Sequence, residues 1–219
     1  MKNYLTIFSD EDLFFKQSLK ATAYYTVLNV PASIIFSFAL ALLLNNDLKF
    51  RGLLRSIYYL PSIVPLVATS MVWLWIFNPD FGLINSLLES VGLPKGMWIF
   101  SEKTVIPSLV LVSLWGTGQT IVIFLAGLQG IPKQYYEAIE VDGGNAFHKL
   151  FKITIPMMTP TIFFNTLMAV INSFQVFVLA YVMTNGGPNN ASFFYVFYLY
   201  REGFQRSNMC YACALAWIL

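Results

Sequence analysis

The sequence carries little charge, and its charged residues avoid four long segments. Only 11% of the 219 residues are Asp, Glu, Lys or Arg, about half the fraction usual in soluble domains, whereas 57% are hydrophobic. No Asp, Glu, Lys, Arg or His occurs in residues 21–44, 56–77, 104–131 or 153–184. Each segment is longer than the roughly 20 residues that cross a bilayer. The pattern excludes a soluble domain and predicts an all-α, polytopic transmembrane helical bundle with four full spans, to which the apolar run 209–219 adds a partial fifth.

Side chains and motifs that commonly carry out chemistry are scarce. The single histidine, His148, has no cysteine or second histidine at metal-ligand spacing. Cys210 and Cys213 lie in an apolar run, and they fit small residues of a membrane helix better than a metal or redox site. The net charge of +2, without a basic run, gives no sign of a nucleic-acid partner. We therefore predict no catalytic residue, no metal and no cofactor.

Two further absences limit how the chain could drive transport. It has no GxxxxGK(S/T) phosphate loop, so it lacks the usual means of hydrolysing ATP. Proton- and ion-coupled carriers usually place an ionisable side chain inside a span, and these spans have none. A secondary carrier or a channel stays open as an alternative, because backbone carbonyls of broken helices can bind Na⁺. The absences favour transport that is driven by a separate subunit.

Residues 132–152 form the polar interruption between the third and fourth predicted spans. Three acidic and three lysine side chains surround Gly143-Gly144, and they favour a salt-bridged polar face over acid–base catalysis. Pro132 fits the first turn of a helix over 133–141, the glycines can end it, and Asn145 can cap a second helix. The density of Lys and Arg in this loop and in residues 45–55 favours the cytoplasmic side for both, whereas the count of these residues alone does not. We expect a helix, a glycine corner and a helix, which either lie on the lipid surface or dock with a partner.

Polar residues inside the spans suggest a solute path. Five residues at helical intervals predict one face of the fourth span, namely Asn165, Met168, Asn172, Gln175 and Leu179. Their amides could bond the hydroxyls of a solute or hold neighbouring helices together, and both interpretations stay open. Trp115 in the third span offers a flat surface suited to sugar rings. The candidate path residues are Trp115, Gln119, Asn172 and Gln175.

The loop resembles the EAA loop of ABC importer permeases, whose pattern is EAA…G…I.LP. The matching residues are Glu137-Ala138-Ile139, Asp142-Gly143, Ile153 and Pro156. The motifs YYLPSIVP, WLWIFNPDFGLIN, FLAGLQGIPKQYYEA, INSFQVF, YVMTNGGPNNAS and CYACALA resemble the carbohydrate-uptake branch, specifically its maltose/glycerol-phosphate-type first permease subunit. The resemblance covers nearly the whole chain. Ile139 and Gly144 depart from it, since alanine is usual at both positions.

The resemblance implies a type I ABC importer permease fold, with residues 1–219 as one transmembrane domain and residues 132–152 as its cytoplasmic coupling loop. It implies contact with the ATPase at six residues: Glu137, Ala138, Asp142, Gly143, Ile153 and Pro156. The implied partners are a second homologous permease subunit, cytoplasmic ATPase subunits, an extracytoplasmic solute-binding protein and the lipid bilayer of a bacterial-type plasma membrane.

Two expectations qualify this resemblance. The family has a helix before the equivalent of Asn3-Tyr4 and a full last helix, so we expect the chain to be a piece of a longer protein. A solute other than a sugar stays open as an alternative, because the loop reports coupling and not the substrate.

Overall fold

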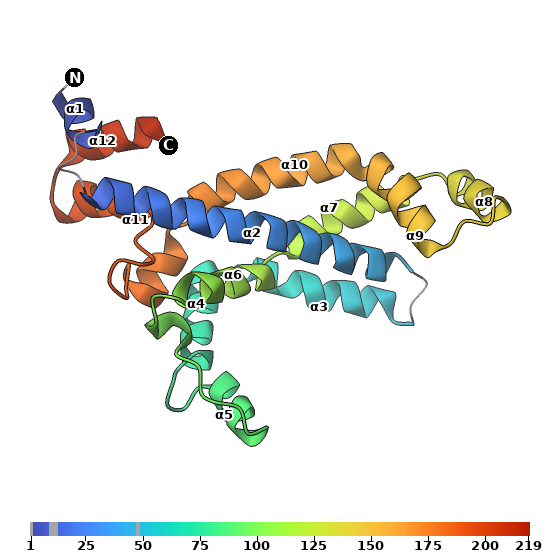
Figure 1. The fold of residues 1–219 in the computed structure, drawn as a ribbon, viewed down its shortest axis with the longest axis horizontal. Coiled ribbons are helices and arrows are strands. Elements are labelled where there is room, and N and C mark those ends of the chain that lie inside the picture. Colours follow the sequence, from blue (N-terminus) through green and yellow to red (C-terminus); the bar gives the residue numbers. More distant parts are fainter. Residues whose placement is uncertain (1, 9–12, 47–48) are drawn as a thin grey trace. The chain divides into compact units, whose positions relative to one another are not determined.

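The computed structural model describes residues 2–8, 13–46 and 49–219, and every regular element in these ranges is helical (Figure 1). The all-α prediction is confirmed. Residues 47 and 48 of the predicted loop 45–55 lie outside the described residues. The α-helices are α1 (Lys2–Phe8), α2 (Leu13–Asn45), α3 (Arg51–Ile63), α4 (Leu66–Ile76), α5 (Leu83–Ser90), α6 (Val105–Trp115), α7 (Gly118–Gln129), α8 (Lys133–Val141), α9 (Ala146–Lys149), α10 (Ile155–Phe174), α11 (Tyr195–Tyr200) and α12 (Met209–Ile218).

Four further elements are tighter or wider than an α-helix. Trp98–Phe100 is a 3₁₀ turn, η1, and three segments are π-helical: η2 (Leu150–Thr154), η3 (Ala180–Thr184) and η4 (Arg201–Gln205). The segments η2 and η4 each adjoin an α-helix directly, η2 leading into α10 and η4 following α11. π-Helical turns are rare and often occur at functional sites.

The predicted spans are present, but not all of them are straight. By length and composition, Phe14–Asn45 and Ala146–Phe174 are each sufficient to cross a membrane. The pair Gly52–Ile63 and Leu66–Ile76 meets the same criteria only when joined across a 99° bend, and Val105–Trp115 with Gly118–Gln129 only across a 55° bend. The described residues therefore contain two such helices, or up to four spans if each bent pair is one span.

Pro65 explains the bend in the second predicted span. A proline disfavours the helical conformation of the residue before it, here Val64, and cannot donate a backbone hydrogen bond. Pro65 is the N-cap residue of α4, with φ −55° and ψ 131°. Pro31 and Pro61, in contrast, lie inside α2 and α3. Prolines are thus accommodated inside these two helices.

The fourth predicted span, residues 153–184, is not one helix. The α-helix α10 ends at Phe174, residues 175–177 are not helical, and the chain resumes as η3. The prediction of one continuous span was therefore wrong at this point. The apolar run 209–219 contains α12, as the partial fifth span requires.

The chain divides into two compact units, which we describe separately. Unit 1 comprises residues 1–29, 64–112 and 170–219, and unit 2 comprises residues 30–63 and 113–169. In unit 1, Phe193, Phe194, Tyr195 and Phe197 are almost fully buried. The Tyr195 amide donates to the Thr22 hydroxyl at 2.9 Å, and the Tyr195 hydroxyl donates to the Leu215 carbonyl at 2.7 Å. Burial, and to a lesser degree the charge of Tyr211, raises the pKa of Tyr195 to about 12, so this hydroxyl remains a donor at neutral pH.

Unit 2 has an apolar core that joins α2, α7 and the start of α10. Its buried residues are Ala41, Leu44, Ile121, Phe124, Leu125, Leu128, Ile131, Ile153 and Met158. The rings of Phe38 and Phe124 meet edge to face at 5.4 Å. Tyr136 and Ile139 of α8 pack against the same cluster, so the predicted coupling helix is attached to the core of this unit.

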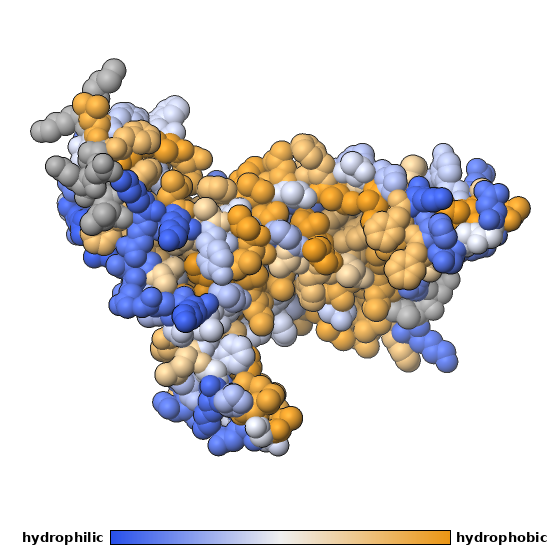
Figure 2. All heavy atoms as spheres, in the orientation of Figure 1, coloured by the Kyte–Doolittle hydropathy of each residue, from blue (hydrophilic) through white to orange (hydrophobic). Residues whose placement is uncertain are grey.

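Apolar side chains also cover much of the surface. Figure 2 shows mainly hydrophobic atoms over α2 and α10, whereas hydrophilic atoms gather around α8 and α9. On α10 the exposed apolar residues include Phe163, Phe164, Leu167, Met168 and Ile171. Such a surface is stable where lipid or another apolar surface covers it.

Gly118 provides a test of the close packing of α3 and α7 within unit 2. A Cβ atom there would lie 2.6 Å from the Tyr58 carbonyl oxygen and 2.9 Å from the Tyr59 Cα, both of which are backbone atoms. We expect Gly118→Ala to lower the free energy of unfolding by about 1–3 kcal/mol, as overpacking typically does. The measurement is thermal unfolding of the purified protein in detergent. Gly116→Ala is the matched control, because its Cβ would meet only Ser113 O, at 3.6 Å. Equal unfolding temperatures for the two variants would contradict this packing.

Candidate functional site: the loop between α7 and α10

The helix α8 has the predicted bounds. It extends over Lys133–Val141, and Pro132 is its N-cap residue rather than part of its first turn. Its amphipathic pattern is also observed, since Tyr136 and Ile139 are half-buried whereas Tyr135 is exposed. One side of α8 therefore faces the core of unit 2 and the other side is free for contact.

A Schellman motif ends α8. The Gly144 amide donates to the Ile139 carbonyl at 2.7 Å, and the Gly143 amide donates to the Glu140 carbonyl at 3.0 Å. The motif requires a left-handed residue directly after the helix, and Gly143 has φ +76°. This is the left-handed conformation that the glycine corner was predicted to contain.

The two glycines are needed for different reasons. A Cβ on Gly143 would meet no atom within 4 Å, so only its positive φ favours glycine. A Cβ on Gly144 would lie 2.7 Å from Cγ1 and 2.8 Å from the carbonyl oxygen of Ile139. Docking of the loop with a partner stayed open as one interpretation of the sequence. Within the structure, the loop's own geometry is a sufficient cause of both glycines, and Ile139 and Gly144, the two departures from the EAA pattern, contact one another.

The second helix of the loop begins with a reciprocal cap. The Asn145 side-chain oxygen accepts from the backbone N–H of His148 at 3.0 Å, and His148 Nδ1 accepts from the backbone N–H of Asn145 at 3.4 Å. The predicted cap at Asn145 is confirmed, and His148 has a structural partner in it. Lys149 of α9 pairs with Glu140 of α8, which supports the interpretation of the charges as a salt-bridged polar face.

The six predicted coupling residues do not all lie at the surface. Glu137, Ala138, Asp142 and Gly143 are exposed around the end of α8, and Pro156 is exposed in the first turn of α10. Ile153 is instead buried in the core of unit 2. The first four residues are thus accessible at the surface, while Ile153 anchors the loop from within.

The outer face of the loop, which comprises the exposed residues Glu137, Ala138, Asp142 and Gly143, also includes two exposed apolar residues. Val141, at the end of α8, is 89% exposed, and Phe147, in α9, is 71% exposed. Neither is among the predicted coupling residues, although the exposure of both follows from the helix bounds, because each lies beside the glycine corner and away from the buried flank. Apolar side chains at the end of a polar loop are typical of a contact surface.

The candidate solute-path residues form two local pairs. Trp115 ends α6 and Gln119 lies in the first turn of α7, on opposite sides of the 55° bend, and both are exposed. Asn172 lies in the last turn of α10, and Gln175 follows the end of that helix. Gln175 also lines a cavity of about 230 Å³ with Val170, Ile171, Phe174 and Leu219. The first pair belongs to unit 2 and the second pair to unit 1.

The face predicted for the fourth span does not extend over all five residues, and its residues differ in exposure. Met168, Asn172 and Gln175 are exposed, but Asn165 and Leu179 are buried. The side-chain amide of Asn165 donates to the Thr161 carbonyl of its own helix at 2.9 Å. The Asn165 side chain therefore neither joins two helices nor faces a solute. The helical spacing fails beyond Phe174 because the helix ends there.

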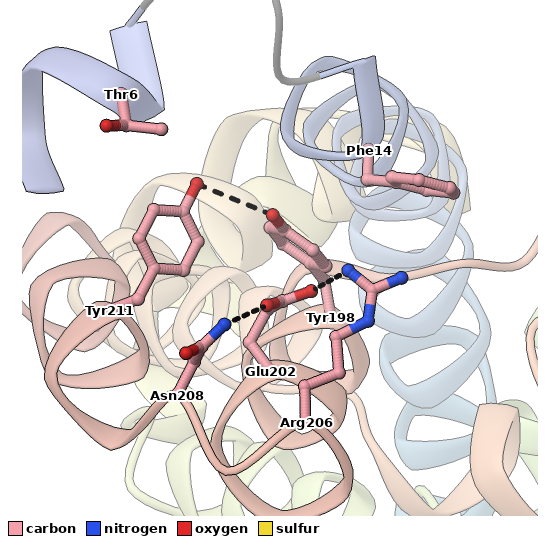
Figure 3. Close-up of a pocket in the computed structure, with 7 residues that line it drawn as sticks. All are labelled: Thr6, Phe14, Tyr198, Glu202, Arg206, Asn208 and Tyr211. Atoms are coloured by element: carbon pink, nitrogen blue, oxygen red, sulfur yellow. Dashed lines mark hydrogen bonds and ion pairs between the residues drawn. The ribbon is translucent and has the colours of Figure 1, made fainter.

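A more polar cavity, of about 290 Å³, also lies in unit 1 (Figure 3). Glu202 is its central residue, with a side chain only 5% exposed. One carboxylate oxygen accepts from Arg206 at 2.6 Å and the other accepts from Asn208 at 3.5 Å, while the hydroxyls of Tyr198 and Tyr211 lie 3.4 Å apart. The group has a structural role, because it holds the turn between α11 and α12. The i, i+4 spacing of Glu202 and Arg206 was a signal that the sequence analysis did not use.

Residues 15–219 match the family of binding-protein-dependent transport system inner membrane components. The chain therefore belongs to this family of membrane proteins. Among its relatives is the probable ABC transporter permease protein YesP of Bacillus subtilis (strain 168), which is 39% identical over 223 residues, with 100% of this chain and 72% of the relative covered. The trehalose/maltose transport system permease protein MalF of Thermococcus litoralis is 31% identical over 193 residues, with 88% of this chain and 65% of that protein covered.

Solved structures share the fold. The crystal structure of a bacterial alginate ABC transporter, in complex with an alginate pentasaccharide-bound periplasmic protein, contains a chain that matches with a TM-score of 0.88. The match covers 100% of this chain and 76% of that chain at 22% sequence identity. The ABC permease fold predicted from the sequence is thus confirmed.

The contact between Ile139 and Gly144 gives a prediction on the stability of the loop. We expect Gly144→Ala to lower the unfolding temperature, with a cost of about 1–3 kcal/mol, because the new Cβ would overlap both the side chain and the carbonyl of Ile139. Adding Ile139→Ala should recover part of this loss but not all of it, because the carbonyl contact remains. The measurement is a double-mutant cycle of thermal unfolding in detergent. Strictly additive effects would show that the two side-chain positions do not interact.

Proposed function

We propose that the chain is the membrane-spanning, multi-pass permease subunit of an importer for a sugar or sugar derivative. In this proposal, the loop 132–152 couples it to a separate ATPase. The family match over residues 15–219 is the observation that carries the proposal. The loop itself adds a physical basis, because its corner is fixed by backbone hydrogen bonds and its outer face is left exposed.

The proposed assembly contains a second homologous permease subunit, two cytoplasmic ATPase subunits and an extracytoplasmic solute-binding protein. Two observations support such partners in general. The family is described as binding-protein-dependent, and the alginate transporter of similar fold was crystallised with a periplasmic protein. The large apolar surface on α10 supports contact with lipid or with another membrane subunit.

The outer face of the loop supports docking on the ATPase. Val141 and Phe147 supply exposed apolar area, and Glu137 and Asp142 supply charge at the rim. Buried apolar anchors surrounded by polar residues are typical of protein interfaces. Closure of the ATPase would move this face, and the attachment of α8 to the core of unit 2 would carry the movement into the spans.

A saccharide is the proposed solute class. A relative of this chain is named as a trehalose/maltose permease, and the alginate transporter was crystallised with a polysaccharide fragment. The exposed indole of Trp115 and the exposed amides of Gln119, Asn172 and Gln175 fit this class. Aromatic faces stack on sugar rings and amides bond to hydroxyl groups, although each pair is described only within its own unit.

A charged substitution at Val141 tests the docking proposal. Val141→Arg places a cation in the centre of the proposed apolar contact, so we expect co-purification of the ATPase subunits in detergent to fall at least about tenfold, a loss of about 1.4 kcal/mol or more. Uptake should fall with it. Val91→Arg is the matched control, since Val91 is also an exposed valine, 76% accessible, but belongs to the segment after α5. Retention of the ATPase by Val141→Arg would overturn the docking role of this face.

Alanine at Asn172 and Gln175 tests the solute path. Each lost hydrogen bond to a bound saccharide is worth about 0.5–1.5 kcal/mol, so we expect the KM for uptake to rise about two- to tenfold per substitution. A panel of radiolabelled sugars, including trehalose and maltose, first identifies one that the wild-type importer accepts. The measurement is uptake of that sugar into proteoliposomes. Asn165→Ala is the control, because the Asn165 amide is buried and bonds to its own helix. Unchanged kinetics in both test variants would remove these residues from the path.

A further inference from the structure

Tyr136 and Thr154 link the two ends of the loop by a hydrogen bond. Tyr136 is in α8 and is half-buried, whereas Thr154 is the last residue of η2 and is only 4% exposed. Their hydroxyl oxygens lie 3.1 Å apart, although 18 residues separate them in sequence. The bond thus connects the exposed helix of the loop to the residue that directly precedes α10.

A second hydrogen bond sets the direction of the first. The Thr154 hydroxyl donates to the Lys149 carbonyl at 3.1 Å. A hydroxyl has a single proton, so Thr154 must accept from Tyr136, and the Tyr136 hydroxyl is the donor. The resulting chain of two bonds joins α8, the end of α9 and the start of α10.

This chain is a directional part of the attachment, and it reaches Thr154, whereas the Glu140–Lys149 ion pair joins α8 only to α9. The hydrophobic contacts of α8 with the core are made by Ile139 and the ring of Tyr136. Apolar contacts are not directional, so they allow α8 to slide or rock while its half-buried side chains stay in contact with the core. The hydrogen bond fixes one point of α8 relative to α10, and it does so at a π turn, where the helix departs from regular α geometry.

We propose that Tyr136 and Thr154 are a positioning pair that makes α8 and the first half of α10 move as one body during the transport cycle. This inference rests on the proposed coupling function of the loop. Without the bond, the ATPase would still hold α8, but part of the movement of α8 would be lost in sliding over the core and would not reach α10.

The test measures whether α8 and α10 move together. Spin labels are attached to cysteines that replace Gln134, exposed on α8, and Phe163, exposed on α10, with Cys210 and Cys213 changed to alanine. The complete assembly with its ATPase subunits is measured by pulsed electron resonance without nucleotide and after trapping with ATP and vanadate. In the wild-type background we expect the distance between the labels to be the same in both states. In Tyr136→Phe and Thr154→Val we expect a shift of about 3 Å or more in the trapped state, or a clearly broader distribution.

Two conservative variants separate this role from a general effect on structure. Thr154→Ser keeps the hydroxyl and should restore the wild-type result. Tyr135→Phe removes the hydroxyl group of a neighbouring tyrosine that is 51% exposed, and it should leave the distance between the labels unchanged. Identical distances in Tyr136→Phe, Thr154→Val and the wild type would overturn the positioning role.

The outcome also distinguishes this inference from the proposed function. If the wild-type chain retains no ATPase subunits, the coupling function itself fails. If it retains them and the positioning variants behave like the wild type, only the role of Tyr136 and Thr154 fails.

Discussion

Backbone hydrogen bonding without water is the constraint on which the rest of this structure depends. Inside a bilayer each unpaired amide or carbonyl costs several kcal/mol, so a helix can break only where something else reduces that cost. In the second span the break falls at Pro65, which has no amide hydrogen to pair. In the third span it falls at Gly116 and Thr117, where the Thr117 hydroxyl donates to the Leu114 carbonyl at 2.8 Å. The bends are thus placed by residues that tolerate them.

The loop 132–152 follows the same constraint outside the spans. Its helices are short, and short helices are weak unless their ends are satisfied. Gly143 supplies the left-handed turn, Gly144 the close approach to Ile139, and Asn145 the cap of the next helix. These three adjacent residues together satisfy the backbone at the end of α8 and at the start of α9. The shape of the corner therefore does not require a partner.

The sequence predicted local features better than distant ones. The bounds of α8, the left-handed glycine and the cap at Asn145 were all predictable, because each depends on neighbours within a few residues. The contact of Ile139 with Gly144 was not, because it depends on how tightly the helix end closes. Likewise, propensity alone does not show that the helix breaks with a 99° bend at Pro65 but continues through Pro31.

The candidate site shows the same limit. The exposed position of Glu137 and Asp142 followed from the polar pattern, whereas the burial of Ile153 depends on residues from α2 and α7. The burial of the Glu202 carboxylate was not predictable, since a sequence does not show which charged side chains the fold encloses.

One of the three π segments bears on how this chain is compared with its relatives. A π turn bonds each amide to the carbonyl five residues earlier, so it accommodates one residue more than an α turn. At 3.6 residues per turn, an extra residue would otherwise rotate everything that follows by about 100°. Only η2 lies directly between two α-helices, α9 and α10, so there the π turn confines this rotation and keeps the faces before and after it in phase. A one-residue gap in an alignment with a regular-helix relative therefore belongs inside η2, where it leaves the exposed and core-facing sides of α10 unchanged.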